Sequence, residues 1–250
     1  MTHQADPRTF IALAAEEILD HQVCFIGIGV PSLAAMLAKR HHAPNAVLIY
    51  ESGAIDADPP VAPLSTGSPS VVQNTPMLAS CLSVFGMLQK GIFDRGFLSA
   101  AQVDRFGNLN STELARKDRP PLHLVGSGGA HDIALLAREI VIIMPHDPRR
   151  FVEHVDFITS PGHRPGSASG SRRPRGGGPV SVVTPRGRFS FAAGELTLEA
   201  VAAGFEEADL VEGFSWTVPR AKTVRRLPPV DQGRLDTAGT LLAAWGRDVA

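Results

Sequence analysis

The sequence has little cysteine, almost no net charge and no long apolar run. Its 250 residues include 24 basic and 25 acidic side chains, for a formal net charge of −1. Such a balance argues against a general nucleic-acid binder, which carries a clustered basic face. No stretch approaches the roughly 18 consecutive apolar residues of a membrane span, and residues 1–7 lack a basic segment followed by an apolar one. We therefore expect a cytoplasmic protein with no nucleic-acid or membrane partner.

Two cysteines, Cys24 and Cys81, are the only thiols of the chain, and both have apolar neighbours. Neither belongs to a CxxC pair, and neither has nearby histidines at a spacing typical of metal ligands. Buried free thiols are therefore expected in place of a disulfide, and no metal site is predicted.

What the sequence does have is a regular alternation of helical periods and short apolar runs. Helices are expected over 10–19, 31–39, 77–89 and 133–138, and strands over 23–26, 46–50, 96–100, 123–125, 140–144, 180–183 and 189–191. This alternation predicts an α/β fold with an open, mainly parallel sheet flanked by helices. No internal repeat is evident, so residues 1–250 are expected to form a single domain. The segment 161–179 is rich in Gly, Pro, Ser and Arg, which predicts a mobile loop.

The most informative stretch is 48–56, where an apolar run leads directly into the sequence Glu51-Ser52-Gly53. Ligands and reactive groups gather where strands of open α/β sheets end in turns. A carboxylate at such a turn, beside a glycine that allows close approach to the backbone, suits a nucleophile. The alternative is an ordinary exposed charge at the end of a strand.

Two glycine-rich turns are also expected to follow strands. The turn 27–32 resembles a dinucleotide fingerprint, but Ser32 replaces the third glycine and no acidic residue follows in a ribose-binding context. A tight strand-to-helix turn is therefore favoured over a nicotinamide or flavin site. The turn 126–132 precedes a helical segment, and its successive N–H groups could hold a phosphate or an oxyanion. A turn without a ligand is the alternative for this second segment.

Three segments, in this order and spacing, resemble the β subunits of family I CoA-transferases, and most of all the glutaconate CoA-transferase branch. They are 51–53, 101–112 and 126–130, and the resemblance continues through 149–151 and 155–162. It covers roughly residues 10–205. The combination is far more specific than any one motif.

The resemblance implies covalent catalysis by Glu51, with a glutamyl-CoA thioester as the intermediate. A glutamate is ionised near pH 7, so this nucleophile needs no general base. The glycine-rich segment is implied to line the oxyanion and CoA site, with Gly126, Gly128, Gly129 and Ala130. The positions expected to support the substrate site are Ser52, Gly53, Gln102 and Asn108.

The resemblance also implies coenzyme A as a co-substrate, without a permanently bound cofactor. The chain corresponds to the β half alone, so an α subunit is the implied partner, in a hetero-oligomer of α2β2 size or larger. The substrates would be an acyl-CoA and a short or dicarboxylic acid. Arg172, Arg173 and Arg175 could contact CoA phosphates, although a solvated loop is the favoured interpretation.

Other activities on the same fold stay open at this point. They are CoA-thioester hydrolysis, ring cleavage, decarboxylation, and a non-catalytic CoA-binding role in which Glu51 is idle. The enzymatic alternatives tend to replace the motif glutamate, so its presence in this sequence favours CoA transfer.

Overall fold

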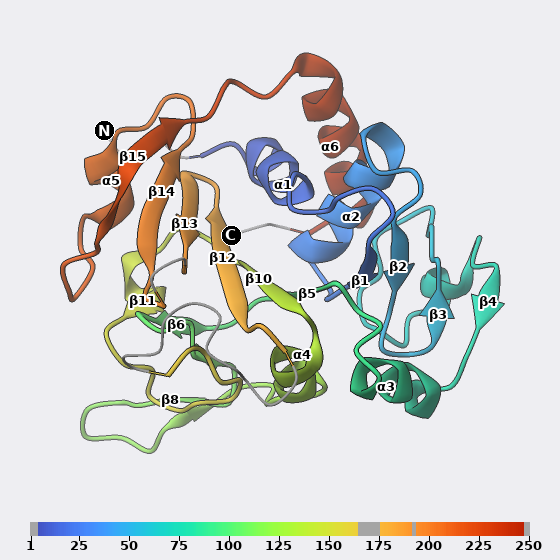
Figure 1. The fold of residues 1–250 in the computed structure, drawn as a ribbon, viewed down its shortest axis with the longest axis horizontal. Helices are drawn as coiled ribbons and strands as arrows, with labels where there is room; N and C mark the ends of the chain where they lie inside the picture. The colour runs from blue at the N-terminus through green and yellow to red at the C-terminus, as the bar shows by residue number, and fades with distance from the viewer. Residues whose placement is uncertain (1–4, 165–175, 192–193, 248–250) are drawn as a thin grey trace.

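The computed structural model describes residues 5–164, 176–191 and 194–247 (Figure 1). Most of the segment predicted to be a mobile loop, 161–179, therefore lies outside the described residues, and so do Arg172, Arg173 and Arg175.

The described part of the chain is organised around a ten-stranded sheet in the order β15-β14-β13-β12-β10-β5-β1-β2-β3-β4 (Figure 1). The strands are β1 Val23–Phe25, β2 Val47–Ile49, β3 Ala54–Ile55, β4 Met77–Leu78, β5 Arg95–Leu98, β10 Glu139–Ile143, β12 Pro179–Thr184, β13 Gly187–Ser190, β14 Thr197–Val201 and β15 Arg220–Arg226. The central strands β12, β10, β5, β1 and β2 run parallel to one another. The carboxyl ends of these five strands therefore meet at one edge of the sheet.

Helices cover both faces of this sheet. On one face, α1 Pro7–Ala15, α2 Val30–His41 and α6 Gln232–Trp245 pack against one another, and α1 also contacts β12 (Figure 1). On the other face lie α3 Cys81–Gln89 and α4 Ala130–Leu136, while the short α5 Glu207–Val211 packs against β14. Alternate residues of β10 join different clusters: Val141 and Ile143 lie in the α1 core, and Ile140 and Ile142 in the α3 core. Because both faces of the central strands are buried, most of their residues are apolar.

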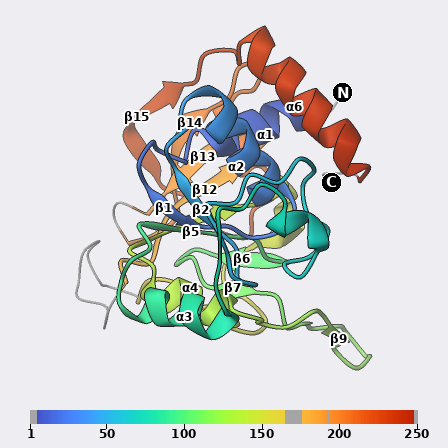
Figure 2. The same ribbon diagram turned by 90° about the vertical axis from the view of Figure 1, so that its right-hand side faces the viewer.

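Within the described residues, two smaller sheets and two 3-10 turns accompany the ten-stranded sheet. One sheet joins β6 Gln102–Asp104, β7 Leu109–Asn110 and β11 Phe151–Val152, and the other joins β8 Glu113–Leu114 to β9 Leu122–His123. The 3-10 turns are Pro69–Val72 and Pro148–Arg150. Figure 2 shows the β8–β9 hairpin projecting away from the body of the molecule.

The predicted open, mainly parallel sheet flanked by helices is confirmed, but three local predictions are wrong. The expected helix 77–89 is shorter, because Met77–Leu78 pairs with β3 and the helix begins only after the Ser80 cap, whose Oγ accepts from Ser83 N at 3.1 Å. The strand expected over 123–125 is instead Leu122–His123, which pairs with β8 in the hairpin outside the main sheet. In both places a partner elsewhere in the chain decides the local structure.

The third error concerns the thiols. Both cysteines are free, and Cys24 is buried as expected, but Cys81 is exposed. Cys81 is the first residue of α3, and the two residues after it are exposed as well. Burial raises the pKa of the Cys24 thiol to about 12, which keeps it protonated and unreactive.

Candidate active site

Glu51 lies at the edge where the parallel strands end, two residues after β2. The buried Tyr50 precedes it, and the turn closes where Gly53 N–H donates to Tyr50 O at 3.0 Å. Burial also raises the pKa of the Tyr50 hydroxyl to about 12, so the side chain next to Glu51 in the chain stays neutral. The Glu51 side chain is half-buried, and Ser52 beside it is exposed. Strand β2 thus ends by presenting a carboxylate at the rim of the sheet.

Gly53 is required at this turn for a reason other than substrate access. Its φ is +114°, and an added Cβ would lie 1.9 Å from Ala79 O. The two segments are also joined by a hydrogen bond in which Ala79 N–H donates to Gly53 O at 2.8 Å. The glycine therefore lets the chain leading into α3 approach the Glu51 turn closely.

The structure brings Glu51 against Gly129. A Cβ added to Gly129 would lie 3.1 Å from Glu51 Oε2 and 2.6 Å from Cζ of Phe85 in α3. Any side chain at this position would therefore press on the carboxylate. The Glu51 turn and the glycine-rich turn, which are separate motifs in the sequence, therefore lie side by side in one site. The ring of Phe85 from α3 packs beside them.

The N–H groups of the glycine-rich turn are not equivalent. Gly126 N–H donates to Ser111 O at 2.8 Å, and Ala130 N–H donates to Ser127 O at 2.9 Å. Among the residues that the structure describes, the N–H groups of Gly128 and Gly129 have no hydrogen-bond acceptor. Of the four residues predicted to line an oxyanion site, only Gly128 and Gly129 thus keep a donor available. The positive φ angles of Gly126 (+87°) and Gly128 (+48°) make the turn possible.

Gln102 makes hydrogen bonds within the protein scaffold. Gln102 Nε2 donates to Asp156 Oδ2 at 3.0 Å, and its Oε1 accepts from Asn110 Nδ2 at 2.8 Å. The side chain is only 8% exposed. These contacts join β6 to β7 and to the segment around Asp156.

Asn108 has a similar place in the turn between β6 and β7. Asn108 Nδ2 donates to Asp104 Oδ2 at 2.8 Å, and its Oδ1 accepts from Gly162 N at 2.7 Å. Burial raises the pKa of Asp104, and the hydrogen bonds from Asn108 and the backbone partly offset this rise. Substrate-site support by Gln102 and Asn108 stays a prediction, and the contacts described here are structural.

Several residues at the site were not singled out by the sequence. Phe85 and Ala79 approach the two glycines of the site from α3 and from the segment before it, which no local motif indicates. Ser111 and Thr159 lie within the motif segments, but their roles depend on tertiary contacts. Their signal in the sequence is only a concentration of small polar residues in 108–112 and 159–160.

The turn 27–32 is a tight connection at the end of β1, beside the strand that leads to Glu51. A Cβ added to Gly27 would lie 2.8 Å from Phe97 O, and Ser32 Oγ donates to Gly27 O at 2.8 Å. Gly29, at φ +87°, is the residue before α2. Gly27 thus lets the turn pass close to the backbone of β5, and Gly29 supplies the positive φ that precedes α2.

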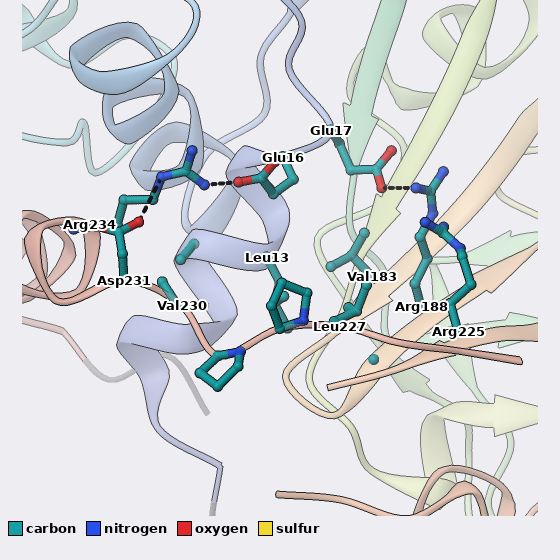
Figure 3. A pocket seen from close by; sticks show the side chains of 14 residues that line it. Leu13, Glu16, Glu17, Val183, Arg188, Arg225, Leu227, Val230, Asp231 and Arg234 are labelled. Carbon is teal, nitrogen blue, oxygen red and sulfur yellow. Dashed lines mark hydrogen bonds and ion pairs between the residues drawn. The ribbon is translucent and has the colours of Figure 1, made fainter. Parts of the chain in front are cut away.

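A cavity of about 540 Å³ lies away from Glu51, between α1, β13 and the chain leading into α6 (Figure 3). Figure 3 shows ion pairs at its two ends, one between Glu16 and Arg234 and one between Glu17 and Arg188, with apolar side chains such as Leu13 between them. None of the residues around Glu51 or Gly129 lines this cavity.

Among the described residues, no group of three or more His, Cys, Asp or Glu side chains is placed to hold a metal ion. In the same part of the chain, no helix is long and apolar enough to cross a membrane.

Comparison with known proteins assigns the family. The Coenzyme A transferase family matches residues 8–169, which is well over half of the chain. The chain belongs to the coenzyme A transferase family. Within this family it is similar to the B subunit of the 3-oxoadipate CoA-transferase of Pseudomonas knackmussii, with 38% identity over 92% of this chain and 90% of that relative. It is also similar to the B subunit of the glutaconate CoA-transferase of Acidaminococcus fermentans, with 32% identity over 86% of this chain and 84% of that relative.

Solved structures agree with this assignment. Glutaconate coenzyme A-transferase from Acidaminococcus fermentans superposes with a TM-score of 0.82 at 28% identity, over 94% of this chain and 93% of that chain. The decarboxylase AibA/AibB superposes with a TM-score of 0.79 at 22% identity, over 94% of each chain, and shares the fold. Both CoA-transferase relatives are named as B subunits of their enzymes, and coenzyme A is the co-substrate of the family.

Proposed function

We propose that this chain is the β subunit of a CoA-transferase that moves CoA between an acyl-CoA and a free acid through a thioester on Glu51. The observation that carries the proposal is the approach of Glu51 Oε2 to Gly129, beside N–H groups that have no acceptor among the described residues. A nucleophile and backbone donors within reach of one reacting carbonyl are the parts that acyl transfer needs.

In the proposed reaction, a Glu51 carboxylate oxygen attacks the thioester carbonyl carbon of the acyl-CoA. The C–S bond breaks, CoA leaves as a thiolate, and a mixed anhydride joins Glu51 to the acyl group. The thiolate then attacks the Glu51 carbonyl carbon, and the acyl group leaves as a free carboxylate. A second acid takes up CoA by the reverse steps. One thioester and one free carboxylate are present both before and after the exchange, so the overall reaction is nearly isoenergetic.

Gly128 and Gly129 are proposed to stabilise the oxyanion that forms when either carbonyl is attacked. Loss of one such donor typically raises a barrier by about 2.7–4 kcal/mol. We propose Gly126 and Ala130 as residues that shape this part of the CoA site, since their own N–H groups are engaged within the protein.

The proposed acid substrate is a short dicarboxylate. The names of two relatives support this class, since 3-oxoadipate and glutaconate are both dicarboxylic acids. We further propose that an α subunit completes the acyl pocket in a hetero-oligomer of α2β2 size or larger. Residues 1–250 are proposed to act as one domain, because the ten-stranded sheet of the described residues includes segments from both halves of the chain.

The alternatives on the same fold are less well supported. The relatives at 38% and 32% identity are named CoA-transferases, whereas the decarboxylase shares only the fold, at 22% identity. A hydrolase would have to admit water to the Glu51 thioester, and a CoA-binding subunit with an idle Glu51 would form no adduct at all.

The test is to trap the intermediate. The chain is produced together with its α subunit and incubated with a panel of acyl-CoA esters that includes glutaconyl-CoA and 3-oxoadipyl-CoA. Borohydride or hydroxylamine is then added, and the peptide spanning Glu51 is analysed by mass spectrometry. An adduct on Glu51 supports the proposal, and the ester that produces it identifies the donor. Binding of CoA esters without any adduct would contradict it.

A further inference from the structure

The glycine-rich turn that faces Glu51 is held at both of its ends by one pair of residues. At the entrance, Ser111 makes two hydrogen bonds to Gly126: Ser111 Oγ donates to Gly126 O at 2.8 Å, and Gly126 N–H donates to Ser111 O at 2.8 Å. Two opposed bonds to a single residue fix both its position and its rotation.

The exit of the turn is held through Thr159. His131, in the first turn of α4, donates from Nδ1 to Thr159 O at 2.9 Å. Gly128 and Gly129 lie between the two attachment points, at Gly126 and His131.

The two attachment points are themselves connected. Thr159 Oγ1 accepts from Ser111 N at 2.9 Å and lies 2.7 Å from the hydroxyl oxygen of Thr112. Thr159 is 4% exposed, so these bonds are shielded from water. Ser111 and Thr159 thus form a brace across the base of the turn.

The buried side chain of Asn110, the residue before Ser111, stabilises the brace. Asn110, next to Ser111, is fully buried, and its Nδ2 donates to Gln102 Oε1 at 2.8 Å and to Glu113 O at 2.6 Å. Asn110 Oδ1 accepts from Thr112 N at 3.0 Å. Ser111 therefore has a fixed residue on either side of it, and movement of its hydroxyl is restricted.

From these contacts we infer that Ser111 and Thr159 are positioning residues for the transfer reaction. They hold the Gly126–His131 segment so that the N–H groups of Gly128 and Gly129 stay aimed at the carbonyl bound to Glu51. This inference rests on the proposed function for its effect on rate, but the holding of the turn can be measured without any activity. Displacing a catalytic donor by about 1 Å can cost roughly 100-fold in rate.

The test compares Ser111→Ala with Ser111→Thr, which keeps the hydroxyl, and with Thr159→Val, which at similar volume removes the Oγ1 that joins Thr159 to Ser111 and leaves the carbonyl that accepts from His131. Ser215→Ala is the matched control, because Ser215 Oγ accepts from a backbone N–H, that of Glu153 at 3.1 Å, in a part of the chain away from the site. In the complex with the α subunit, the rate of Glu51 thioester formation, kcat and KM are measured for each variant. Thermal melting checks that each variant is folded.

We expect Ser111→Ala and Thr159→Val to lower the rate of thioester formation and kcat by about 10- to 100-fold, with KM for the acyl-CoA changed less than about threefold. Ser111→Thr should recover most of the lost rate, and Ser215→Ala should match the wild type. A rate for Ser111→Ala within twofold of the wild type, or equal losses in Ser111→Ala and Ser111→Thr, would overturn the inference.

Hydrogen exchange on the β chain separates this inference from the proposed function. Ser111→Ala should speed amide exchange in the peptide that covers 126–131 by about fivefold, which is the expected effect of losing one neutral hydrogen bond. If the wild-type complex forms no thioester, the proposed function fails, and the exchange result alone then decides whether the brace holds the turn. Unchanged amide hydrogen exchange at 126–131 in Ser111→Ala would show that Ser111 does not hold the turn.

Discussion

Glu51 and Glu17 are glutamates in two regions of one molecule, and their surroundings are opposite. Glu17 is 3% exposed and lies beside two guanidinium groups, with Oε1 at 3.1 Å from Arg188 Nη1 and Oε2 at 3.4 Å from Arg95 Nη1. Ser181 Oγ also donates to Glu17 Oε2 at 3.3 Å. Glu51 is half-buried beside Gly129, and no ion pair involves it within the part of the chain that the structure describes.

The difference shows what each carboxylate can do. Burial raises the pKa of Glu17, and the charges of Arg188 and Arg95 partly offset that rise. The two ion pairs connect the chain just after α1 to strands β13 and β5 of the sheet. The oxygens of Glu17 are occupied by donors and are poorly placed to attack a carbonyl. The Glu51 carboxylate has no hydrogen-bond or ion-pair partner among the described residues and lies beside Gly129 of the turn with unpaired N–H groups, which suits covalent catalysis.

The largest expected effect is the loss of CoA exchange in Glu51→Gln. The substitution keeps the volume of the side chain but removes the nucleophilic charge, so CoA exchange should fall by at least about 10⁴-fold, as when other covalent nucleophiles are removed. Stability should hardly change, because Glu51 has no ion-pair partner among the described residues. Exchange assays and thermal melting of the complex measure the two effects. Retention of exchange would remove Glu51 from the mechanism.

The matching substitution Glu17→Gln should instead lower the stability of the protein and leave the rate of CoA exchange nearly unchanged. It leaves two guanidinium groups beside an uncharged amide, and breaking a buried ion pair from one side costs about 3 kcal/mol. Urea unfolding of the chain measures the loss of stability, and the exchange rate of the folded complex should stay close to that of the wild type. Loss of exchange without loss of stability would contradict a structural role for Glu17.

Gly129→Ala is expected to reduce turnover by about 100-fold, because the new methyl group would meet Glu51 Oε2 at 3.1 Å and move the carboxylate. The effect on folding should be small, since the closest atom, Cζ of Phe85, is the far end of a side chain. Gly86→Ala in α3 is the matched control, because an added Cβ at Gly86 meets nothing within 4 Å. Equal activities in the two variants would show that Gly129 does not shape the site.

A pH-dependent effect is expected at His146, a buried imidazole whose acidic neighbours Asp147 and Asp209 only partly offset the effect of burial. Burial lowers the pKa of His146 to about 4, and the Arg186 charge acts in the same direction. Its ring stacks on Phe214 and Phe189, with centroids 6.0 and 6.4 Å away. Between pH 6.5 and 4 the unfolded chain binds a proton at this residue and the folded chain does not. The free energy of unfolding should therefore fall as pH is lowered through this window, by up to about 1.4 kcal/mol per pH unit from this group.

Urea unfolding at several pH values measures this dependence in the wild type and in His146→Leu, which cannot titrate at this position. The variant should lose less stability than the wild type on going from pH 6.5 to pH 4. The same pH dependence in both proteins would mean that burial does not keep His146 neutral.

Much of the architecture could be predicted from the sequence because it depends on local periodicity. Apolar runs such as 140–144 indicate strands buried on both faces, and the spacing in 31–39 indicates a helix that packs on one face. Glu51 stood out for the same local reason, since a charge follows directly on a buried strand. The predictions for 77–89 and 123–125 were wrong where a partner strand overrode the local pattern.

The sequence by itself determined the alternation of strands and helices, the carboxylate at the end of β2 and the motifs that resemble the CoA-transferases. Only the tertiary structure decided which residues of those motifs meet. It placed Gly129 against Glu51, engaged the N–H groups of Gly126 and Ala130, and joined Ser111 to Thr159 across the base of the turn. The physical reason is that most of these contacts join segments far apart in the chain. Hydrogen-bond geometry and steric fit between such segments depend on how the sheet and helices pack, and no local pattern of residues encodes them.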